Sequence, residues 1–204
     1  SLRLRPGDRI SEAEIAAQFG VSRQPVRDSF TRLANMDLLQ IRPQRATEVK
    51  RFSSREIEKS RFVRASVESE VLRRAARNID VVGEAKLALC LNRQREAIAA
   101  RDYKAFGALD YEFHQELCAI AGVDFAFEVI ASEKAKVDRL CMLGLAKEDR
   151  MPQLVADHEA ITAAITAGDE DGAVAAGMVH LSRLDATIEA IEASNAQYFA
   201  PDPV

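Results

Sequence analysis

The sequence lacks any long apolar run. A membrane-spanning helix needs about 18 or more consecutive apolar residues, and the most apolar stretch of this chain, residues 87–91, is far shorter. The first 20 residues alternate Arg with Leu and then become acidic, so the apolar core of a secretory signal is also missing. These absences exclude a membrane protein and lead us to expect a cytoplasmic one.

Cysteine is scarce and scattered. Cys90, Cys118 and Cys141 stand among Leu, Ala and Met, and the chain has no Cys-x-x-Cys pair. This pattern excludes a disulfide framework and a thiolate zinc site, and we expect three buried free thiols. The chain also has no internal repeat and no low-complexity segment, and its 204 residues are enough for one large domain or two small ones.

The net charge of −4 conceals an asymmetry along the chain. Residues 1–52 contain ten basic and six acidic residues, a net charge of +4, whereas residues 53–204 have a net charge of −8. A basic N-terminal segment on an acidic body favours the binding of a polyanion such as DNA. The alternative is that these basic residues are simply solvated surface.

Residues 11–35 have the pattern of two helices joined by a tight turn. Ser11 is a good N-cap for a first helix over residues 12–19, and Gly20 is placed to end it. Ser22 caps the second helix, whose first turn contains Pro25 at little cost. The apolar faces of the two helices are formed by Ile15, Ala16 and Phe19 and by Val26, Phe30 and Leu33. This is the layout of a helix-turn-helix, in which the second helix enters the major groove.

A pair of strand-like segments follows the second helix. Residues 38–41 and 47–50 favour short strands, and the segment between them contains Arg42 and Arg45. This pattern predicts a hairpin with a basic tip, a wing that can reach phosphates or the minor groove. We therefore predict a winged helix-turn-helix DNA-binding domain over residues 1–52.

The motifs of this segment resemble those of GntR-type bacterial transcription regulators. Residues 6–12 read Pro-Gly-Asp-Arg-Ile-Ser-Glu, residues 21–28 read Val-Ser-Arg-Gln-Pro-Val-Arg-Asp, and the resemblance extends over residues 4–49. The DNA-binding residues that it implies are Ser22, Arg23, Gln24 and Arg27 on the second helix and Gln44 and Arg45 at the wing tip. Because one short helix and a wing give little specific affinity alone, we expect a homodimer that binds double-stranded DNA at a palindromic operator.

Residues 53–204 have helical patterns throughout. Ser53 and Glu56 form a capping box that opens a helix to about residue 77. Further helices are predicted over residues 80–100, 102–121, 124–146, 152–167 and 169–197, with Asp80, Asp102, Asp124 and Asp169 as N-caps. The predicted fold is therefore mostly α: a winged helix-turn-helix followed by an antiparallel bundle of six to seven helices.

All three histidines lie in this second domain, each at an inward position on a different predicted helix. Asp110 and His114 are four residues apart and share a helix face. His158 and His180 each lie about 15 Å from the turn between their helices, at about 1.5 Å per residue, and are therefore level. Three imidazoles and a carboxylate suit a divalent metal, most naturally Zn²⁺, with Ni²⁺ and Mn²⁺ as alternatives. The competing interpretation is three separate hydrogen-bonded core histidines.

The same pattern resembles the metal-binding motif of the FCD domain, found in the FadR branch of the GntR regulators. Its residues here are Asp110, His114, His158 and His180. The resemblance covers residues 54–192 and implies small carboxylic acids as effectors, which often coordinate the metal directly. Arg64 and Glu68 resemble an Arg-x3-Glu element of such domains, so Arg64 is a candidate clamp for the effector carboxylate, with Arg139 as a second candidate. The alternative for Arg64 is a surface ion pair with Glu68.

Together these patterns predict a metabolite-responsive DNA-binding transcription regulator, most simply a repressor. Its second domain binds a divalent metal and a small organic acid that modulates operator binding. The alternative is a metal-dependent enzyme on a helical bundle. That alternative lacks support because the body has no His-Glu-x-x-His and no paired Glu-x-x-His motif, and it leaves the basic wing without a role.

Overall fold

The computed structural model describes residues 4–42, 45–141 and 150–201. The chain divides into two compact units, which we call the head (Ser1–Glu56 with Glu192–Val204) and the body (Ile57–Ile191). The predicted DNA-binding segment, residues 1–52, lies in the head. The second predicted domain, residues 53–204, differs from the observed division because the C-terminal segment belongs to the head.

Helices α1 (Glu12–Phe19) and α2 (Arg23–Asn35) form the predicted helix-turn-helix. The Ser11 hydroxyl accepts a hydrogen bond from the backbone N–H of Glu14 at 3.1 Å and so caps α1. Gly20 ends α1 with a φ of 64°, a left-handed conformation that glycine adopts without steric cost. Both helix-end signals in the sequence are therefore confirmed.

The described part of the head contains a three-stranded antiparallel sheet in the order β1-β3-β2. Strands β2 (Leu39–Gln40) and β3 (Thr47–Val49) form the predicted wing, and β1 (Arg9–Ile10) adds a strand that the sequence pattern did not predict. The buried core of the head consists of Ile10, Ala16, Val26, Phe30, Leu39 and Val49. Phe19, expected in this core, is 70% exposed at the end of α1, so Ala16 is the one fully buried residue of that helix.

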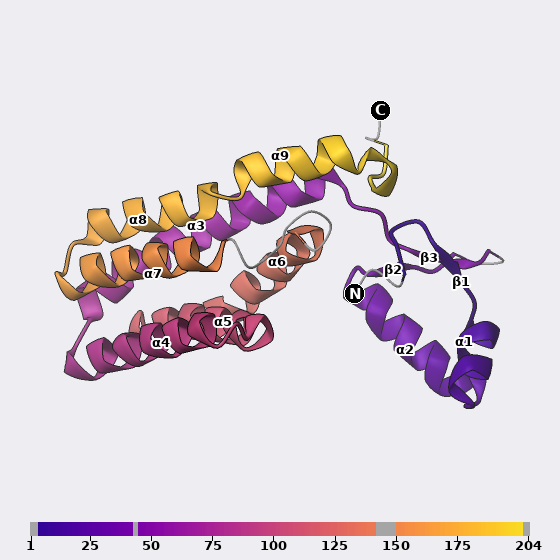
Figure 1. The fold of residues 1–204 in the computed structure, drawn as a ribbon, viewed down its shortest axis with the longest axis horizontal. Helices are drawn as coiled ribbons and strands as arrows, with labels where there is room; N and C mark the ends of the chain where they lie inside the picture. Colours follow the sequence, from indigo (N-terminus) through magenta and orange to yellow (C-terminus); the bar gives the residue numbers. More distant parts are fainter. Residues whose placement is uncertain (1–3, 43–44, 142–149, 202–204) are drawn as a thin grey trace. The chain divides into compact units, whose positions relative to one another are not determined.

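The remaining helices form the predicted antiparallel bundle (Figure 1). They are α3 (Ser54–Asn78), α4 (Val81–Ala99), α5 (Tyr103–Ile120), α6 (Ala126–Cys141), α7 (Met151–Thr166), α8 (Glu170–Ser182) and α9 (Asp185–Ser194). Helix α4 packs against α5 and α7, and α7 packs against α8. The Ser53 hydroxyl accepts a hydrogen bond from the N–H of Glu56 at 3.3 Å, as the predicted capping box requires. The end of the predicted 124–146 helix lies outside the described residues, and the seven helices named here agree with the six to seven that were predicted.

Three of the four predicted aspartate caps are confirmed. The carboxylates of Asp80, Asp102 and Asp169 each accept a hydrogen bond from the backbone N–H three residues later, at 2.7, 2.9 and 2.9 Å respectively. The fourth prediction, Asp124, is wrong because α6 begins only at Ala126, after a turn. Local side-chain capping therefore explains most of the helix starts in the body.

The last predicted helix, residues 169–197, is divided. Helix α8 ends at Ser182 and α9 begins at Asp185. At the break, Arg183 donates from Nε to both carboxylate oxygens of Asp157 on α7, at 2.9 and 2.8 Å. This bond between α7 and the α8–α9 junction is a tertiary contact that a helical sequence pattern does not report.

The C-terminal segment belongs to the head because it pairs with the linker residue Phe52. The N–H of Phe52 donates to the carbonyl of Tyr198 at 2.9 Å, and the N–H of Ala200 donates to the carbonyl of Phe52 at 2.7 Å. The rings of Phe52 and Phe199 lie 5.6 Å apart, and Phe52 is 4% exposed. A buried ring and two backbone hydrogen bonds thus hold the end of the chain against the linker.

The core of the body brings residues of several helices together. Its fully buried side chains include Leu87, Phe113, Ile130, Ile161 and Ile165. The three cysteines are free and buried, as expected. A Cβ built at Gly177 would overlap Cδ1 of Leu72, so α8 approaches α3 as closely as only glycine allows. Among the described helices none has the length and apolar character needed to cross a bilayer.

Candidate functional site

The three histidines of the body come together from three helices. His114 lies on α5, His158 on α7 and His180 on α8, and one ring nitrogen from each lies within 4.8 Å of the other two. All three side chains are buried. The rings of His158 and His180 are 4.9 Å apart, so the two helices bring them to the same level as their spacing predicted.

An acceptor stands behind each of the first two imidazoles. His114 Nδ1 lies 3.1 Å from Oε2 of Glu68, and His158 Nδ1 lies 2.9 Å from Oε1 of Gln94. The opposite nitrogens, Nε2 of both histidines, are buried and have no hydrogen-bond partner among the described residues. Buried nitrogens without a partner are rare in folded proteins, whereas a histidine that binds a metal uses one nitrogen as ligand and the other as donor to an acceptor.

His180 has a looser partner. Its Nδ1 lies 3.7 Å from Oδ2 of Asp157, too far for a hydrogen bond, and Asp157 already accepts from Arg183. Burial lowers the pKa of His180 and lowers the pKa of His158 well below its ordinary value. Both shifts favour the neutral imidazole, which is the form that binds a metal.

Asp110 lies beside the histidines on α5. Its Oδ1 is 3.4 Å from Nε2 of His158, and its Oδ2 is 2.7 Å from Nζ of Lys134 on α6. Burial alone would raise the pKa of Asp110, but the ammonium group of Lys134 outweighs it and holds that pKa well below its ordinary range. Asp110 is therefore an ionised carboxylate. Together with the three imidazoles it forms a donor set that fits a borderline divalent ion.

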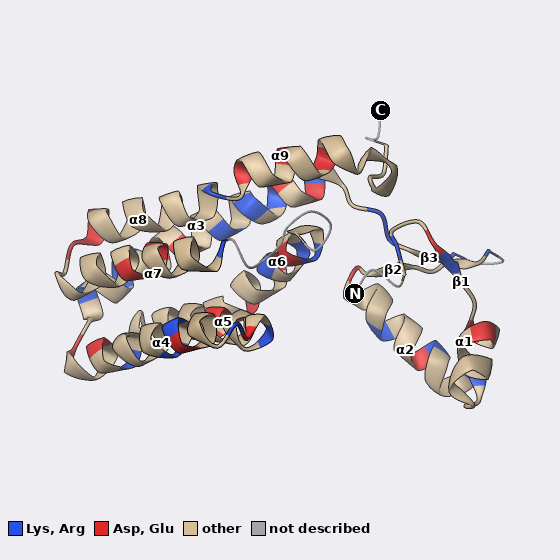
Figure 2. Ribbon diagram, viewed as in Figure 1, with Lys and Arg blue, Asp and Glu red and all other residues tan. Residues whose placement is uncertain are grey.

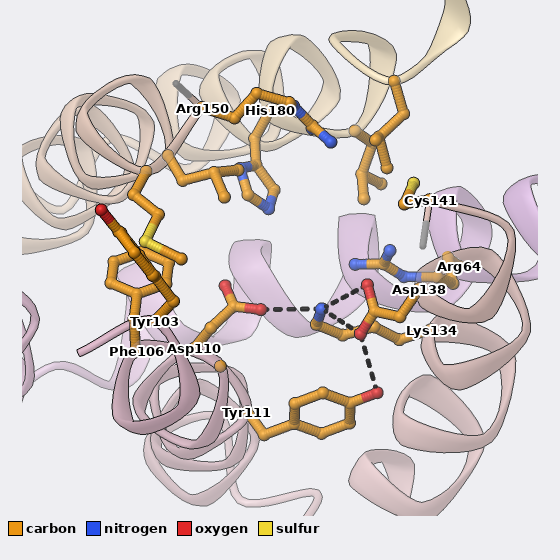
Figure 3. A pocket seen from close by; sticks show the side chains of 15 residues that line it. Arg64, Tyr103, Phe106, Asp110, Tyr111, Lys134, Asp138, Cys141, Arg150 and His180 are labelled. Carbon is orange, nitrogen blue, oxygen red and sulfur yellow. Dashed lines mark hydrogen bonds and ion pairs between the residues drawn. The ribbon is translucent and has the colours of Figure 1, made fainter. Parts of the chain in front are cut away.

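A cavity of about 200 Å³ opens beside this cluster (Figure 3). Arg64, Asp110, Lys134, Arg150 and His180 bring charged or polar groups to its wall. Its apolar wall includes Phe106, Met151, Leu154, Leu181 and Leu184. A small cavity with apolar walls and a few polar groups is typical of a metabolite site.

Arg64 is buried, so it does not form the surface ion pair with Glu68 that was the alternative to an effector clamp. The residue is 5% exposed, and its Nε lies 2.8 Å from Oε1 of Glu68. Its Nη2 is buried and has no partner among the residues described, and in Figure 3 the guanidinium faces the cavity. Glu68 in turn lies against His114, so Arg64 connects the cavity to the histidine cluster. Arg139, the second candidate clamp, does not line this cavity or its neighbour.

The sequence analysis missed several residues of the site. Gln94 lies 64 positions before His158, and nothing in its local sequence indicates that contact. Lys134 and Asp138 are four residues apart on α6, and their hydrogen bonds of 2.9 and 3.1 Å follow a spacing that is visible in the sequence. The sequence could have indicated this pair, because Lys134 falls at the spacing of the apolar residues Ile130 and Val137, which form the buried face of α6.

The predicted DNA-contacting residues lie on the exposed side of the head. Ser22, Arg23, Gln24 and Arg27 on or next to α2 and Arg45 in the wing are exposed, and Gln44 lies outside the described residues. Figure 2 shows basic positions along α2, near β1 and after β3. Arg27 Nη2 pairs with Oε2 of Glu12 on α1 at 3.1 Å. Arg23 makes no hydrogen bond or ion pair within the described part of the chain.

A winged helix-turn-helix joined to an all-helical body defines a class of two-domain DNA-binding regulators. Comparison with known proteins identifies the class further. Residues 1–49 match the family of bacterial regulatory proteins named gntR, and residues 61–183 match the FCD domain. The chain belongs to the GntR family and carries an FCD domain. It is a DNA-binding transcription regulator, and the alternative prediction of a metalloenzyme is not supported.

Relatives of known sequence and structure agree with this assignment. The chain is 34% identical to the HTH-type transcriptional repressor RspR of Escherichia coli K12 over 98% of its own length and 87% of the relative's. It is 35% identical to an HTH-type transcriptional regulator of Streptomyces ambofaciens over 99% of its length and 85% of the relative's. Its fold matches that of E. coli McbR/YncC with a TM-score of 0.71 at 19% identity, covering 92% of this chain and 89% of the other.

Proposed function

We propose that the body binds a divalent metal ion and a small carboxylic acid, and that the acid changes the affinity of the head for operator DNA. The observation that carries this proposal is the cluster of three buried imidazoles, in which the buried Nε2 atoms of His114 and His158 have no hydrogen-bond partner among the described residues. Hydrogen-bonded core histidines, the competing interpretation, would use both ring nitrogens or expose one to water.

The metal ligands in this proposal are Asp110, His114, His158 and His180. Zn²⁺ is the first choice, with Ni²⁺ and Mn²⁺ as alternatives, because imidazole and carboxylate ligands suit all three ions. A bound ion would supply open coordination positions for carboxylate oxygens. Arg64, whose buried Nη2 has no partner among the described residues, provides a second cationic contact for the same carboxylate.

The DNA-binding part of the proposal rests on α2 and the wing. Each chain contributes one short recognition helix, so we propose a homodimer on a palindromic operator in the cytoplasm, with each α2 in one major groove. The named relative RspR is a repressor, and we propose the same direction of control here. The FCD domain supports placement in the FadR branch of the family.

Metal, acid and DNA binding are linked thermodynamically. If the acid binds more tightly to one arrangement of the protein, and that arrangement differs in operator affinity, each ligand must change the affinity for the other by the same factor. Such coupling free energies are typically about 1–3 kcal/mol, or roughly 5- to 150-fold in affinity.

The test is His158→Ala and His180→Ala, with Gln115→Ala as the control. Gln115 is exposed on α5 next to His114 and takes no part in the cluster. Metal content is measured by mass spectrometry, and operator affinity is measured with and without candidate acids. We expect both histidine variants to lose the metal and the response to acid. Variants that lose the metal but keep the full response would contradict the proposal.

A further inference from the structure

The cavity beside the histidines has a second polar wall that contains none of the four proposed metal ligands. We call it the α6 wall, and it consists of Tyr111 on α5 with Lys134 and Asp138 on α6 (Figure 3). The Tyr111 hydroxyl donates to Oδ2 of Asp138 at 3.0 Å. Lys134 Nζ donates to Oδ2 and Oδ1 of Asp138 at 2.9 and 3.1 Å. The wall therefore places a carboxylate, an ammonium and a phenol within one hydrogen-bonded group.

The carboxylate of this wall has unused capacity. Of the described residues only Lys134 donates to Oδ1 of Asp138, and a carboxylate oxygen can accept two hydrogen bonds. The side chain of Asp138 is 39% exposed, so a ligand in the cavity can reach it. Tyr111 keeps an acceptor lone pair on its hydroxyl oxygen in addition to the bond that it donates.

The charges of the wall decide which ligand groups it can bind. Lys134 is already balanced by two carboxylates, since Oδ2 of Asp110 lies 2.7 Å from its Nζ and Asp138 lies on its other side. A second carboxylate on the ligand would meet Asp138 and be repelled. An apolar tail would leave polar groups of the wall without water or partner, which is costly. A hydroxyl group both donates and accepts, and so satisfies the wall without added charge.

We infer that the α6 wall is a hydroxyl-binding subsite and that the effector is a hydroxylated carboxylic acid. Its carboxylate faces the buried Nη2 of Arg64 and the histidine cluster, and its hydroxyl groups donate to Asp138 and bond with Tyr111. This inference rests on the proposed function, because it assigns the other end of the same ligand. The cavity of about 200 Å³ is below the roughly 300 Å³ at which pockets for drug-sized ligands begin, so the acid is short.

The experiment compares three four-carbon acids on the full-length, metal-loaded protein by titration calorimetry. The acids are butyrate, succinate and 2,3,4-trihydroxybutyrate, which differ in hydroxyl content and charge but little in length. We expect the trihydroxy acid to bind about tenfold or more tightly than butyrate, because a site built to bind a hydroxyl rejects the analogue that lacks it. We expect succinate to gain no advantage over butyrate.

Two variants test the residues of the wall. Asp138→Ala removes the acceptor, and Tyr111→Phe removes one hydroxyl while keeping the ring, so the second variant remains informative if the first does not fold. We expect each variant to reduce the preference for the trihydroxy acid over butyrate about fivefold or more. The control is Glu112→Ala on α5, whose side chain pairs with Arg93 outside the cavity. It should leave the three affinities unchanged.

The outcomes separate this inference from the proposed function. If butyrate binds as tightly as the trihydroxy acid, or if both wall variants keep the parent preference, the hydroxyl subsite is wrong while the effector role stands. Tighter binding of succinate than of the trihydroxy acid would likewise overturn the subsite and indicate a dianionic effector. If none of the three acids binds to the metal-loaded protein, the effector role and the subsite both fail.

Discussion

Gln94 and His158 face each other with Oε1 and Nδ1 2.9 Å apart, and a second hydrogen bond decides which atoms meet. Nε2 of Gln94 donates to the carbonyl oxygen of Leu109 at 3.2 Å, so its Oε1 is turned to the imidazole. An amide oxygen can only accept, and therefore Nδ1 of His158 carries the proton. Nε2 then presents a lone pair toward Asp110 and the other histidines, which is the tautomer that a metal ligand needs.

Gln94→Leu tests this arrangement. The leucine side chain removes the acceptor behind His158, so the imidazole is free to rotate and to change tautomer. We expect metal affinity to fall about 10- to 100-fold, the usual effect of removing a partner behind a ligating histidine. Metal affinity is measured by competition with a chelating dye. Gln115→Leu, at an exposed glutamine of α5, is the matched control; equal affinities in the two variants would show that Gln94 does not orient the ligand.

Arg23 and Arg27 differ in their contacts within the head, and we expect their alanine variants to differ in operator affinity. Arg23 has no partner among the described residues, so Arg23→Ala should weaken operator binding by about 1–3 kcal/mol if the side chain binds a guanine. Arg27 is held by Glu12, so part of its charge is neutralised before DNA arrives. We expect Arg27→Ala to cost more affinity in a Glu12→Ala background than in the parent.

Fluorescence anisotropy at several salt concentrations measures these affinities. The body should be unaffected, so its helical content and metal content serve as controls. Operator binding equal to that of the parent in both arginine variants would mean that α2 is not the recognition helix.

The buried histidines predict how stability depends on pH. Burial lowers the pKa of His158 well below 6.5 and lowers that of His180, whereas in the unfolded chain both imidazoles titrate near 6.5. As pH falls through about 6.5 the unfolded state therefore binds more protons than the folded state, and the free energy of unfolding decreases. We expect the urea midpoint of metal-free protein to fall between pH 7.5 and about 5.5.

The matched variant for this prediction is the double substitution His158→Gln and His180→Gln. It should show a shallower dependence on pH over the same range. Glu68 does not titrate over this range of pH. Its burial would raise its pKa, but His114 and Arg64 outweigh burial and lower that pKa to about 2. A parent and a double variant with the same slope would show that these imidazoles do not titrate on unfolding.

The close packing of α8 against α3 at Gly177 leads to a prediction about stability. Because a Cβ there would overlap Cδ1 of the buried Leu72, Gly177→Ala must displace either that side chain or α8, and overpacking of this kind costs about 1–3 kcal/mol. A Cβ at Gly107 on α5 would meet no described atom within 4 Å, so Gly107→Ala should be neutral or stabilising by up to about 1 kcal/mol. Urea unfolding measures both. Similar midpoints for the two variants would mean that the close approach at Gly177 relaxes without cost.

Local chemistry explains what could be predicted from the sequence. Ser11 and Gly20 act on their own helix ends, and the level of His158 and His180 follows from the rise per residue along two helices joined by a short turn. Strand β1 could not be predicted, because two residues form a strand only when the wing pairs with them. The partners of the histidines, such as Gln94, were missed for the same reason: they are defined by tertiary contacts between distant segments.

The pairing of Phe52 with the C-terminal segment has a mechanical consequence. The chain crosses from the head to the body along α3 and returns along α9, so the head is attached at two points rather than one. Leu181 and Leu184, at the junction that leads into α9, line the ligand cavity. The segment that pairs with Phe52 is therefore continuous in sequence, through α9, with residues that line the cavity.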